Sequence, residues 1–264
     1  MNALLAVLLG LVQGLCEFLP VSSSGHLVLL QNIFGLEEEA LFFNTMLHMG
    51  TLVAVVAVYY KQLWALIRKP FQKKVGLLLA ATLITTAVAF LFRDFFDEAF
   101  EGRFLGFGFV LTAVILFLNE RIARGKQTIA GMKYPQALGV GLMQGIAILP
   151  GVSRSGSTIA GSRFFGLTKE DAAEFSFLLS IPAILGSLVL QIPDVVKTGT
   201  GGVSWLCVIL GTAVAAVSGY FAIRLMLRLI AKKSLMGFSI YVLILGVLVL
   251  GDQFIFHLFF ERPF

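Results

Sequence analysis

The chain has 264 residues, of which 58% are hydrophobic and only 13% are charged, and its mean hydropathy is +0.93. This composition excludes an ordinary soluble domain and predicts a single all-α integral membrane domain over residues 1–264. The formal net charge of +5 could suggest a nucleic-acid partner, but the basic residues fall between the apolar segments, where membrane topology explains them and no nucleic acid is needed.

Six apolar stretches are predicted to cross the membrane, which takes about 20 helical residues. In chain order they cover 41–60, 76–93, 104–118, 172–192, 204–222 and 235–256. Two further apolar stretches, 2–19 and 137–150, run directly into loops rich in Ser and Gly. We interpret these two as re-entrant segments. We expect no cleaved signal peptide, because the first basic residue is Lys61.

The distribution of Lys and Arg predicts the orientation of the chain. Basic residues concentrate in connections at 61–74, 121–133 and 224–233, whereas the connections at 94–101 and 194–197 are acidic or sparsely charged. Basic connections stay in the cytoplasm. The first re-entrant segment should then enter from outside and the second from inside, in opposite directions.

The sequence also repeats itself. LVQGLCEFLPVSSSG at 11–25 aligns without a gap on LMQGIAILPGVSRSG at 142–156, at a constant offset of 131 residues. The identical pairs include Gln13 and Gln144, Gly14 and Gly145, Val21 and Val152, Ser22 and Ser153, Ser24 and Ser155, and Gly25 and Gly156. This pattern predicts an inverted duplication, with residues 1–120 and 136–256 each holding one re-entrant segment and three spanning helices.

The two Ser-Gly loops should meet near the membrane midplane, because non-helical backbone at that depth must be buried in protein or line a wet cavity. Hydroxyls, loop amides and an arginine suit phosphate oxygens, so we expect an anion site there. Its predicted phosphate-binding residues are Ser22, Ser24, Gly25, Ser153, Arg154, Ser155 and Gly156.

Glu17 is an ionisable residue in an apolar segment and is therefore a candidate for function. Gln13 lies four residues earlier and shares its helical face, so the two could hold a divalent cation, Mg²⁺ or Ca²⁺. The second copy has Ile148 and Ser157 where the first has Glu17 and His26, which makes the site asymmetric.

This asymmetric set of groups has the parts for phosphoryl transfer, with Glu17, Ser23, His26 and Arg154 as the candidate catalytic residues. His48 could support the site or form a hydrogen bond between helices, and we favour the second.

QGLCEFLPVSSSGH at 13–26 and PGVSRSGSTIAG at 150–161 resemble the two signature regions of the undecaprenyl pyrophosphate phosphatase family, also called bacitracin resistance proteins. FNTMLHMGTLVAV at 43–55 and EFSFLLSIP at 174–182 resemble further segments of that family. The resemblance implies a divalent-cation-dependent enzyme of the bacterial inner membrane. It would convert undecaprenyl pyrophosphate to the monophosphate carrier lipid needed for peptidoglycan synthesis and would confer bacitracin resistance.

By the same resemblance, the family's acidic motif falls on Gln13 and Glu17, its serine-histidine loop on 22–26 and its arginine loop on 153–155. Some members carry Glu at the position of Gln13, so Glu17 should do more of the metal binding here. Two nucleophiles stay open: Ser23 activated by His26 or Glu17, or His26 itself. We favour Ser23, with His26 as the general acid and base.

The main alternative is a flippase that moves a polyprenyl phosphate through the same site without chemistry, because inverted repeats with broken helices are a transporter architecture. The asymmetry between the copies favours an enzyme. We expect the site to face the periplasm. The sequence leaves open whether the protein forms a homodimer.

Overall fold

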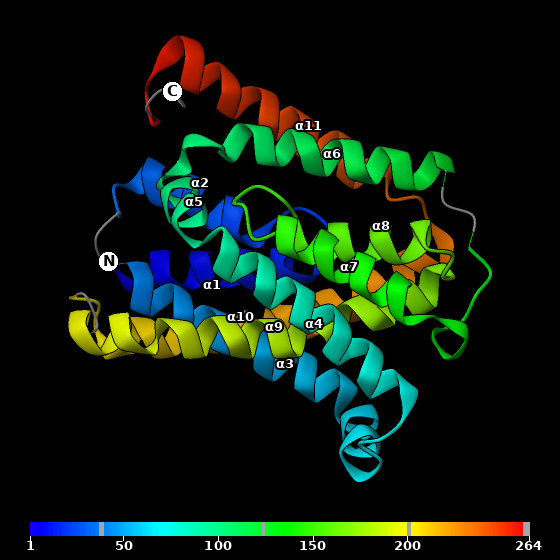
Figure 1. Cartoon of the computed structure of the whole chain (residues 1–264). Coiled ribbons are helices and arrows are strands. Elements are labelled where there is room, and N and C mark those ends of the chain that lie inside the picture. Colours follow the sequence, from blue (N-terminus) through cyan, green and yellow to red (C-terminus); the bar gives the residue numbers. More distant parts are fainter. Residues whose placement is uncertain (37–39, 123–124, 200–201, 261–264) are drawn as a thin grey trace.

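The computed structural model describes residues 1–36, 40–122, 125–199 and 202–260 (Figure 1). The structure is helical, and no β-strand occurs within these ranges. Six of the helices are long and apolar enough to cross a membrane, as the sequence predicts. They are α3 (Ala40–Arg68), α4 (Lys73–Leu91), α6 (Leu105–Ile122), α9 (Lys169–Thr198), α10 (Trp205–Lys232) and α11 (Met236–Gly251).

Several predicted helix ends are wrong, because the helices continue beyond the apolar runs. α3 ends at Arg68 instead of residue 60, and α10 ends at Lys232 instead of residue 222. Lys and Arg are good helix formers, and their long stems can pack on the helix while the charge reaches water. Arg68 and Arg224 are exposed, and their guanidinium groups lie over the rings of Trp64 and Tyr220. The basic residues expected in the connection at 224–233 therefore lie mostly on α10.

Two pairs of shorter helices occupy the predicted re-entrant segments. α1 (Ala3–Phe18) is followed by α2 (Ser23–Phe34), and α7 (Tyr134–Ile146) by α8 (Arg154–Phe164). The two members of each pair pack against each other, and in Figure 1 the second helix runs back along the first. α1 has 16 residues and α7 has 13, fewer than a span requires. These lengths favour the re-entrant interpretation, which stays a prediction.

The remaining elements are short. α5 (Arg93–Glu98) and η1 (Ala99–Arg103) join α4 to α6, η2 (Ile129–Gly131) precedes α7, and η3 (Asp252–Phe256) follows α11. The connection predicted at 94–101 is thus helical. The side chain of Gln253 donates hydrogen bonds to the carbonyl groups of Gly102 and Arg103, which fastens η3 to η1.

The breaks within the two short helix pairs are stabilised by the same hydrogen bonds. Ser22 caps α2 by accepting from the N–H of Gly25 at 3.2 Å, and Ser153 caps α8 by accepting from the N–H of Gly156 at 3.0 Å. Side-chain oxygens at the start of a helix satisfy N–H groups that have no partner within the helix. The identical caps, 131 residues apart, favour the predicted duplication, which stays a prediction.

Glycines let each first short helix approach a long helix of the other half. α1 packs on α10 and α7 packs on α4. A Cβ atom at Gly10 would lie 2.4 Å from the carbonyl oxygen of Gly211, and one at Gly141 would lie 2.3 Å from that of Ala81. Gly10 and Gly141 are equivalent in the repeat, so the same close backbone contact occurs twice. This contact sets how closely α1 and α7 approach α10 and α4, and so helps to position the loops that follow them.

We expect Gly10→Ala to lower the thermal unfolding temperature in detergent, because the added methyl group forces α1 away from the backbone of α10. Overpacking of this kind costs about 1–3 kcal/mol. Gly186→Ala is the matched control, since nothing lies within 4 Å of a Cβ atom there and alanine favours a helix by about 1 kcal/mol. Equal stability of the two variants would contradict the packing argument.

Candidate functional site

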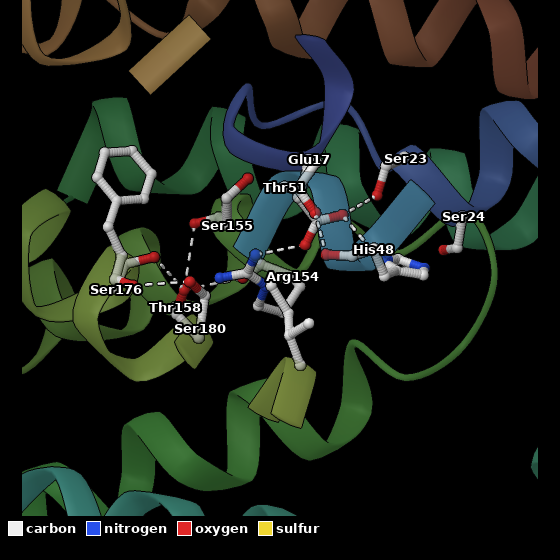
Figure 2. Close-up of polar contacts among 12 residues, drawn as sticks. Glu17, Ser23, Ser24, His48, Thr51, Arg154, Ser155, Thr158, Ser176 and Ser180 are labelled. Atoms are coloured by element: carbon white, nitrogen blue, oxygen red, sulfur yellow. Dashed lines mark hydrogen bonds and ion pairs between the residues drawn. The ribbon is translucent and has the colours of Figure 1, made fainter. Parts of the chain in front are cut away.

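The two oxygens of the Glu17 carboxylate form the centre of a buried polar cluster. Glu17 lies one residue before the end of α1 and is 7% exposed. Its Oε1 accepts a hydrogen bond from Nη2 of Arg154 at 2.6 Å, and its Oε2 accepts one from the hydroxyl of Ser23 at 2.5 Å (Figure 2). Gln13 donates to the same Oε2 at 3.1 Å. Glu17 therefore joins α1, α2 and α8.

The loops that follow α1 and α7 are in direct contact. The hydroxyl of Ser155 donates to the carbonyl of Leu19 at 2.9 Å, which links the start of α8 to the end of α1. Thr112 of α6 holds the second loop, because its hydroxyl donates to the carbonyl of Gly151 and accepts from the N–H of Ser153, both at 2.8 Å. Sequence reasoning missed Thr112, which lies about 40 residues from the loop and carries no motif.

Arg154 has a nitrogen that is available to an anion. While Nη2 pairs with Glu17, Nη1 is buried and has no hydrogen-bond partner among the described residues. A buried guanidinium N–H without a partner is costly, and a phosphate oxygen would satisfy it. Arg154 is the first residue of α8, so its head also lies at the positive end of that helix.

Other predicted phosphate-binding residues use their hydrogen bonds within the loops. The N–H groups of Gly25 and Gly156 donate to the capping serines, and Ser24 lies near Ser22 with 3.4 Å between the hydroxyl oxygens. The equivalent oxygens of Ser153 and Ser155 are 3.3 Å apart. These residues shape the loops, and their contact with phosphate stays a prediction.

Glu17 is held in its ionised form. Burial alone would raise its pKa, but the charge of Arg154, together with the hydrogen bonds from Ser23 and Arg154, lowers the pKa to about 2. Glu17 is not on one of the six spanning helices. The ionised carboxylate can only accept hydrogen bonds, which orients the Ser23 hydroxyl toward it.

His48 of α3 is also part of this cluster. Gln13 must present its Nε2 to the Glu17 carboxylate, and the same Nε2 lies 3.0 Å from Nδ1 of His48. Nδ1 of His48 is therefore an acceptor, and it lies 3.8 Å from Oε2 of Glu17. The hydrogen bond between helices that we favoured for His48 is present, and it also supports the site. No sequence spacing relates His48 to Glu17.

His26 is held apart from these groups. Its Nδ1 lies 2.7 Å from the carbonyl oxygen of Ser22, and its Nε2 lies 2.7 Å from the hydroxyl oxygen of Tyr241 in α11. Its hydrogen bonds within the described ranges thus do not include one to Ser23, which donates to Glu17 instead. Burial lowers the pKa of His26, and the hydrogen bond to the Ser22 carbonyl partly offsets this.

The donor set fits a metal ion only if phosphate supplies further ligands. Among the described residues, no group of three or more His, Cys, Asp or Glu side chains could hold a metal. The cluster offers the Glu17 carboxylate and Oε1 of Gln13, which is buried and lacks a hydrogen-bond partner within the described ranges. One or two protein oxygens, completed by waters and substrate phosphates, are typical of Mg²⁺ sites.

Comparison with known proteins agrees with the motifs. The family model described as bacitracin resistance protein BacA matches residues 6–248. The chain belongs to this family. It is 47% identical over 256 residues to the undecaprenyl-diphosphatase of Carboxydothermus hydrogenoformans, covering 96% of this chain and 98% of that protein. It is 42% identical over 255 residues to undecaprenyl-diphosphatase 4 of Bacillus thuringiensis subsp. konkukian, with the same coverage.

A third member of the family, the undecaprenyl-diphosphatase of Halothermothrix orenii, is 38% identical over 247 residues, which is 92% of this chain and 95% of that protein. The family predicted from the two signature regions is thus confirmed over nearly the whole chain. Together with the six long apolar helices, it identifies a multi-pass membrane protein.

We expect Glu17→Ala to destabilise the protein by about 3–5 kcal/mol, because it leaves the Arg154 charge buried without its partner. The double variant Glu17→Ala/Arg154→Ala should lose less unfolding free energy than the sum of the losses in the two single variants. Unfolding in detergent measures all three.

Asp97→Ala is the control for this double-mutant cycle, because it breaks an ion pair with Arg93 in which both side chains are about 70% exposed. Asp97→Ala should lower the free energy of unfolding by less than about 1 kcal/mol. Strict additivity of the Glu17 and Arg154 losses would show that the two residues are not coupled.

Proposed function

We propose that this protein is an undecaprenyl-diphosphatase, which hydrolyses undecaprenyl pyrophosphate to undecaprenyl phosphate and inorganic phosphate. The observation that carries this proposal is the buried carboxylate that binds a serine hydroxyl on one oxygen and an arginine on the other. The choice of undecaprenyl pyrophosphate as the substrate rests on the relatives named undecaprenyl-diphosphatase.

Ser23 is the proposed nucleophile. Its oxygen attacks the terminal phosphorus, the bond from that phosphorus to the bridging oxygen breaks, and undecaprenyl phosphate leaves. The proton of Ser23 passes to Glu17, which already accepts its hydrogen bond. This assigns the activation of Ser23 to Glu17 instead of His26, the residue that sequence reasoning favoured.

Arg154 couples substrate binding to the basicity of Glu17. Its free Nη1 binds a phosphate oxygen and opposes the negative charge that develops in the transition state. A guanidinium that shares its charge with a phosphate stabilises the Glu17 carboxylate less. The pKa of Glu17 then rises, and Glu17 becomes a stronger base when the substrate is in place.

His26 serves the second half of the reaction. It lies three residues after Ser23 and therefore on the same side of α2. Water attacks the phosphoserine, the Ser23–phosphorus bond breaks, and inorganic phosphate leaves. His26 takes a proton from that water and later releases it to solvent, and Glu17 returns its proton to the Ser23 oxygen.

Glu17 and Oε1 of Gln13 would hold a divalent cation, Mg²⁺ or Ca²⁺, together with oxygens of the pyrophosphate. When bound, such a cation supplies positive charge that offsets the charge of the two phosphates. Gln13 contributes no charge, so the metal affinity of the site depends on Glu17.

We place the protein in the bacterial inner membrane, with the site facing the periplasm. The basic residues at the ends of α3 and α10 support a cytoplasmic position for those ends. The reaction would return the carrier lipid to peptidoglycan synthesis and confer the bacitracin resistance for which the family is named. A flippase gains no support, because the relatives compared are named as diphosphatases.

Phosphate release from a prenyl pyrophosphate in detergent tests the catalytic residues. Ser23→Ala removes the nucleophile, Glu17→Gln removes the base, and Arg154→Lys removes the paired guanidinium nitrogens. Each variant should lower kcat by about 10²–10⁴-fold. A chelator should abolish release, and added Mg²⁺ or Ca²⁺ should restore it.

Ser187→Ala is the control for these variants, because its hydroxyl donates to the carbonyl of Ile184 in the same helix, α9. It should retain full activity. No release by a folded native protein, or undiminished release by Ser23→Ala, would refute the assignment.

The nucleophile can be identified by trapping the phosphoenzyme formed from substrate labelled in the terminal phosphate. A phosphoserine survives an acid quench, whereas a phosphohistidine is lost in acid and survives in base. We expect an acid-stable label that is absent from Ser23→Ala and present in His26→Ala. A base-stable label that disappears in His26→Ala would identify His26 as the nucleophile.

A further inference from the structure

We propose that Tyr241 is a positioning residue for His26: the Tyr241 hydroxyl donates to the unprotonated ring nitrogen and so favours the neutral imidazole. This proposal rests on the proposed function for its catalytic consequence, but the contact between the two residues is independent of it. Tyr241 is on α11, 215 positions from His26, and the hydroxyl oxygen lies 2.7 Å from Nε2 of the imidazole.

The hydrogen bonds around His26 specify one tautomer. The carbonyl oxygen of Ser22, 2.7 Å from Nδ1, can only accept, so Nδ1 carries the proton. In the neutral ring Nε2 is then an acceptor, and the hydroxyl of Tyr241 donates to it. A protonated ring would have hydrogen on both nitrogens, and Tyr241 would have to turn its own proton away. Donation from Tyr241 therefore favours neutral His26.

Two aromatic rings hold the imidazole in place. The Tyr241 ring is stacked on it, with 5.7 Å between centroids and 14° between planes, and Phe109 of α6 meets it edge-on at 5.4 Å. Phe109 is completely buried, whereas Tyr241 is 47% exposed. Tyr241 can thus move away from Nε2 without opening the core, and this frees Nε2 to take a proton from water.

Within the described residues, the hydrogen bonds and ring contacts of His26 are with Ser22, Tyr241 and Phe109, and none of these groups is charged. Burial lowers the pKa of His26, and the hydrogen bond to the carbonyl of Ser22, the residue that precedes α2, raises it. From the helices packed nearby, α6 presents the uncharged ring of Phe109, Cys16 of α1 interacts with Tyr241, and Arg103 of η1 is exposed. Among the residues that the structure describes, Tyr241 is therefore the titratable side chain in direct contact with the imidazole.

Tyr241→Phe tests the proposal, because it keeps the stacked ring and removes only the hydroxyl. Loss of a donor to the neutral ring should raise the pKa of His26 by about 0.5–1 pH unit. Activity that needs neutral His26 is lost as the pH falls through its pKa. The acidic limb of the kcat profile should consequently move to higher pH by the same amount, with little change in KM.

The pKa can be measured directly, because the chain has only three histidines. ¹⁵N NMR of the histidine-labelled protein in detergent follows each imidazole, and His26→Ala identifies the signal of His26. The native protein should show the Nδ1–H tautomer. Tyr241→Leu, which also removes the stacked ring, should show at least as large a shift.

Tyr60→Phe is the matched control, since Tyr60 is a 58% exposed tyrosine of α3 whose ring contact is with Lys61. It should leave both the NMR titration and the pH profile unchanged. A native titration of His26 in Tyr241→Phe would overturn the proposal. If the native protein releases no phosphate, the proposed function fails. The NMR titration then still decides whether Tyr241 shifts the pKa of His26.

Discussion

A carboxylate buried inside a membrane protein needs a partner, and in this structure the partner of Glu17 comes from the opposite half of the chain. Removing an ion from water costs several kcal/mol, which a close and well-oriented pair can offset. Arg154 provides that pair, with 2.6 Å between Nη2 and Oε1. Because the two residues lie at the end of α1 and the start of α8, the need to neutralise Glu17 holds the two loops together. The second oxygen of Glu17 accepts the hydrogen bond from Ser23. Nη1 of Arg154, which has no partner among the described residues, can bind a ligand.

The position of this pair depends on how closely the short helices approach their neighbours. Gly10 and Gly141 bring α1 and α7 into backbone contact with α10 and α4, which fixes the lateral position of each short helix. Beyond the ends of α1 and α7 the backbone leaves the helix, and its N–H groups need other acceptors. Ser22 and Ser153 supply them as caps. Residues that look like phosphate ligands in the sequence are thus also the residues that allow a helix to break inside the protein.

The sequence predicts those features that are local or periodic. The lengths of the apolar stretches predict the six long helices. Glu17 is recognisable as an ionisable residue in an apolar segment, and Arg154 as a residue of the repeated Ser-Gly loop. Helix ends were harder to predict, because basic side chains continue a helix that hydropathy would end. His48 and Tyr241 lie on spanning helices 31 and 224 residues from Glu17, and only the packing of these helices shows that they contact the site. The pairing of Ser23 with Glu17, in preference to His26, likewise depends on side-chain directions that spacing along a helix does not specify.

The repeat makes the asymmetry of the site chemically necessary. Ser23 and Arg154 are equivalent positions, 131 residues apart, and each is the first residue of the helix that follows a break. Their side chains reach the two oxygens of the same carboxylate. Serine in both copies would leave Glu17 buried with its charge uncompensated, and arginine in both would remove the hydroxyl that we propose as the nucleophile. Because Ile148 replaces Glu17 in the second copy, only one such carboxylate has to be neutralised. The difference between Ser23 and Arg154 therefore lets the protein bury the Glu17 carboxylate as an ion and also place a hydroxyl on it.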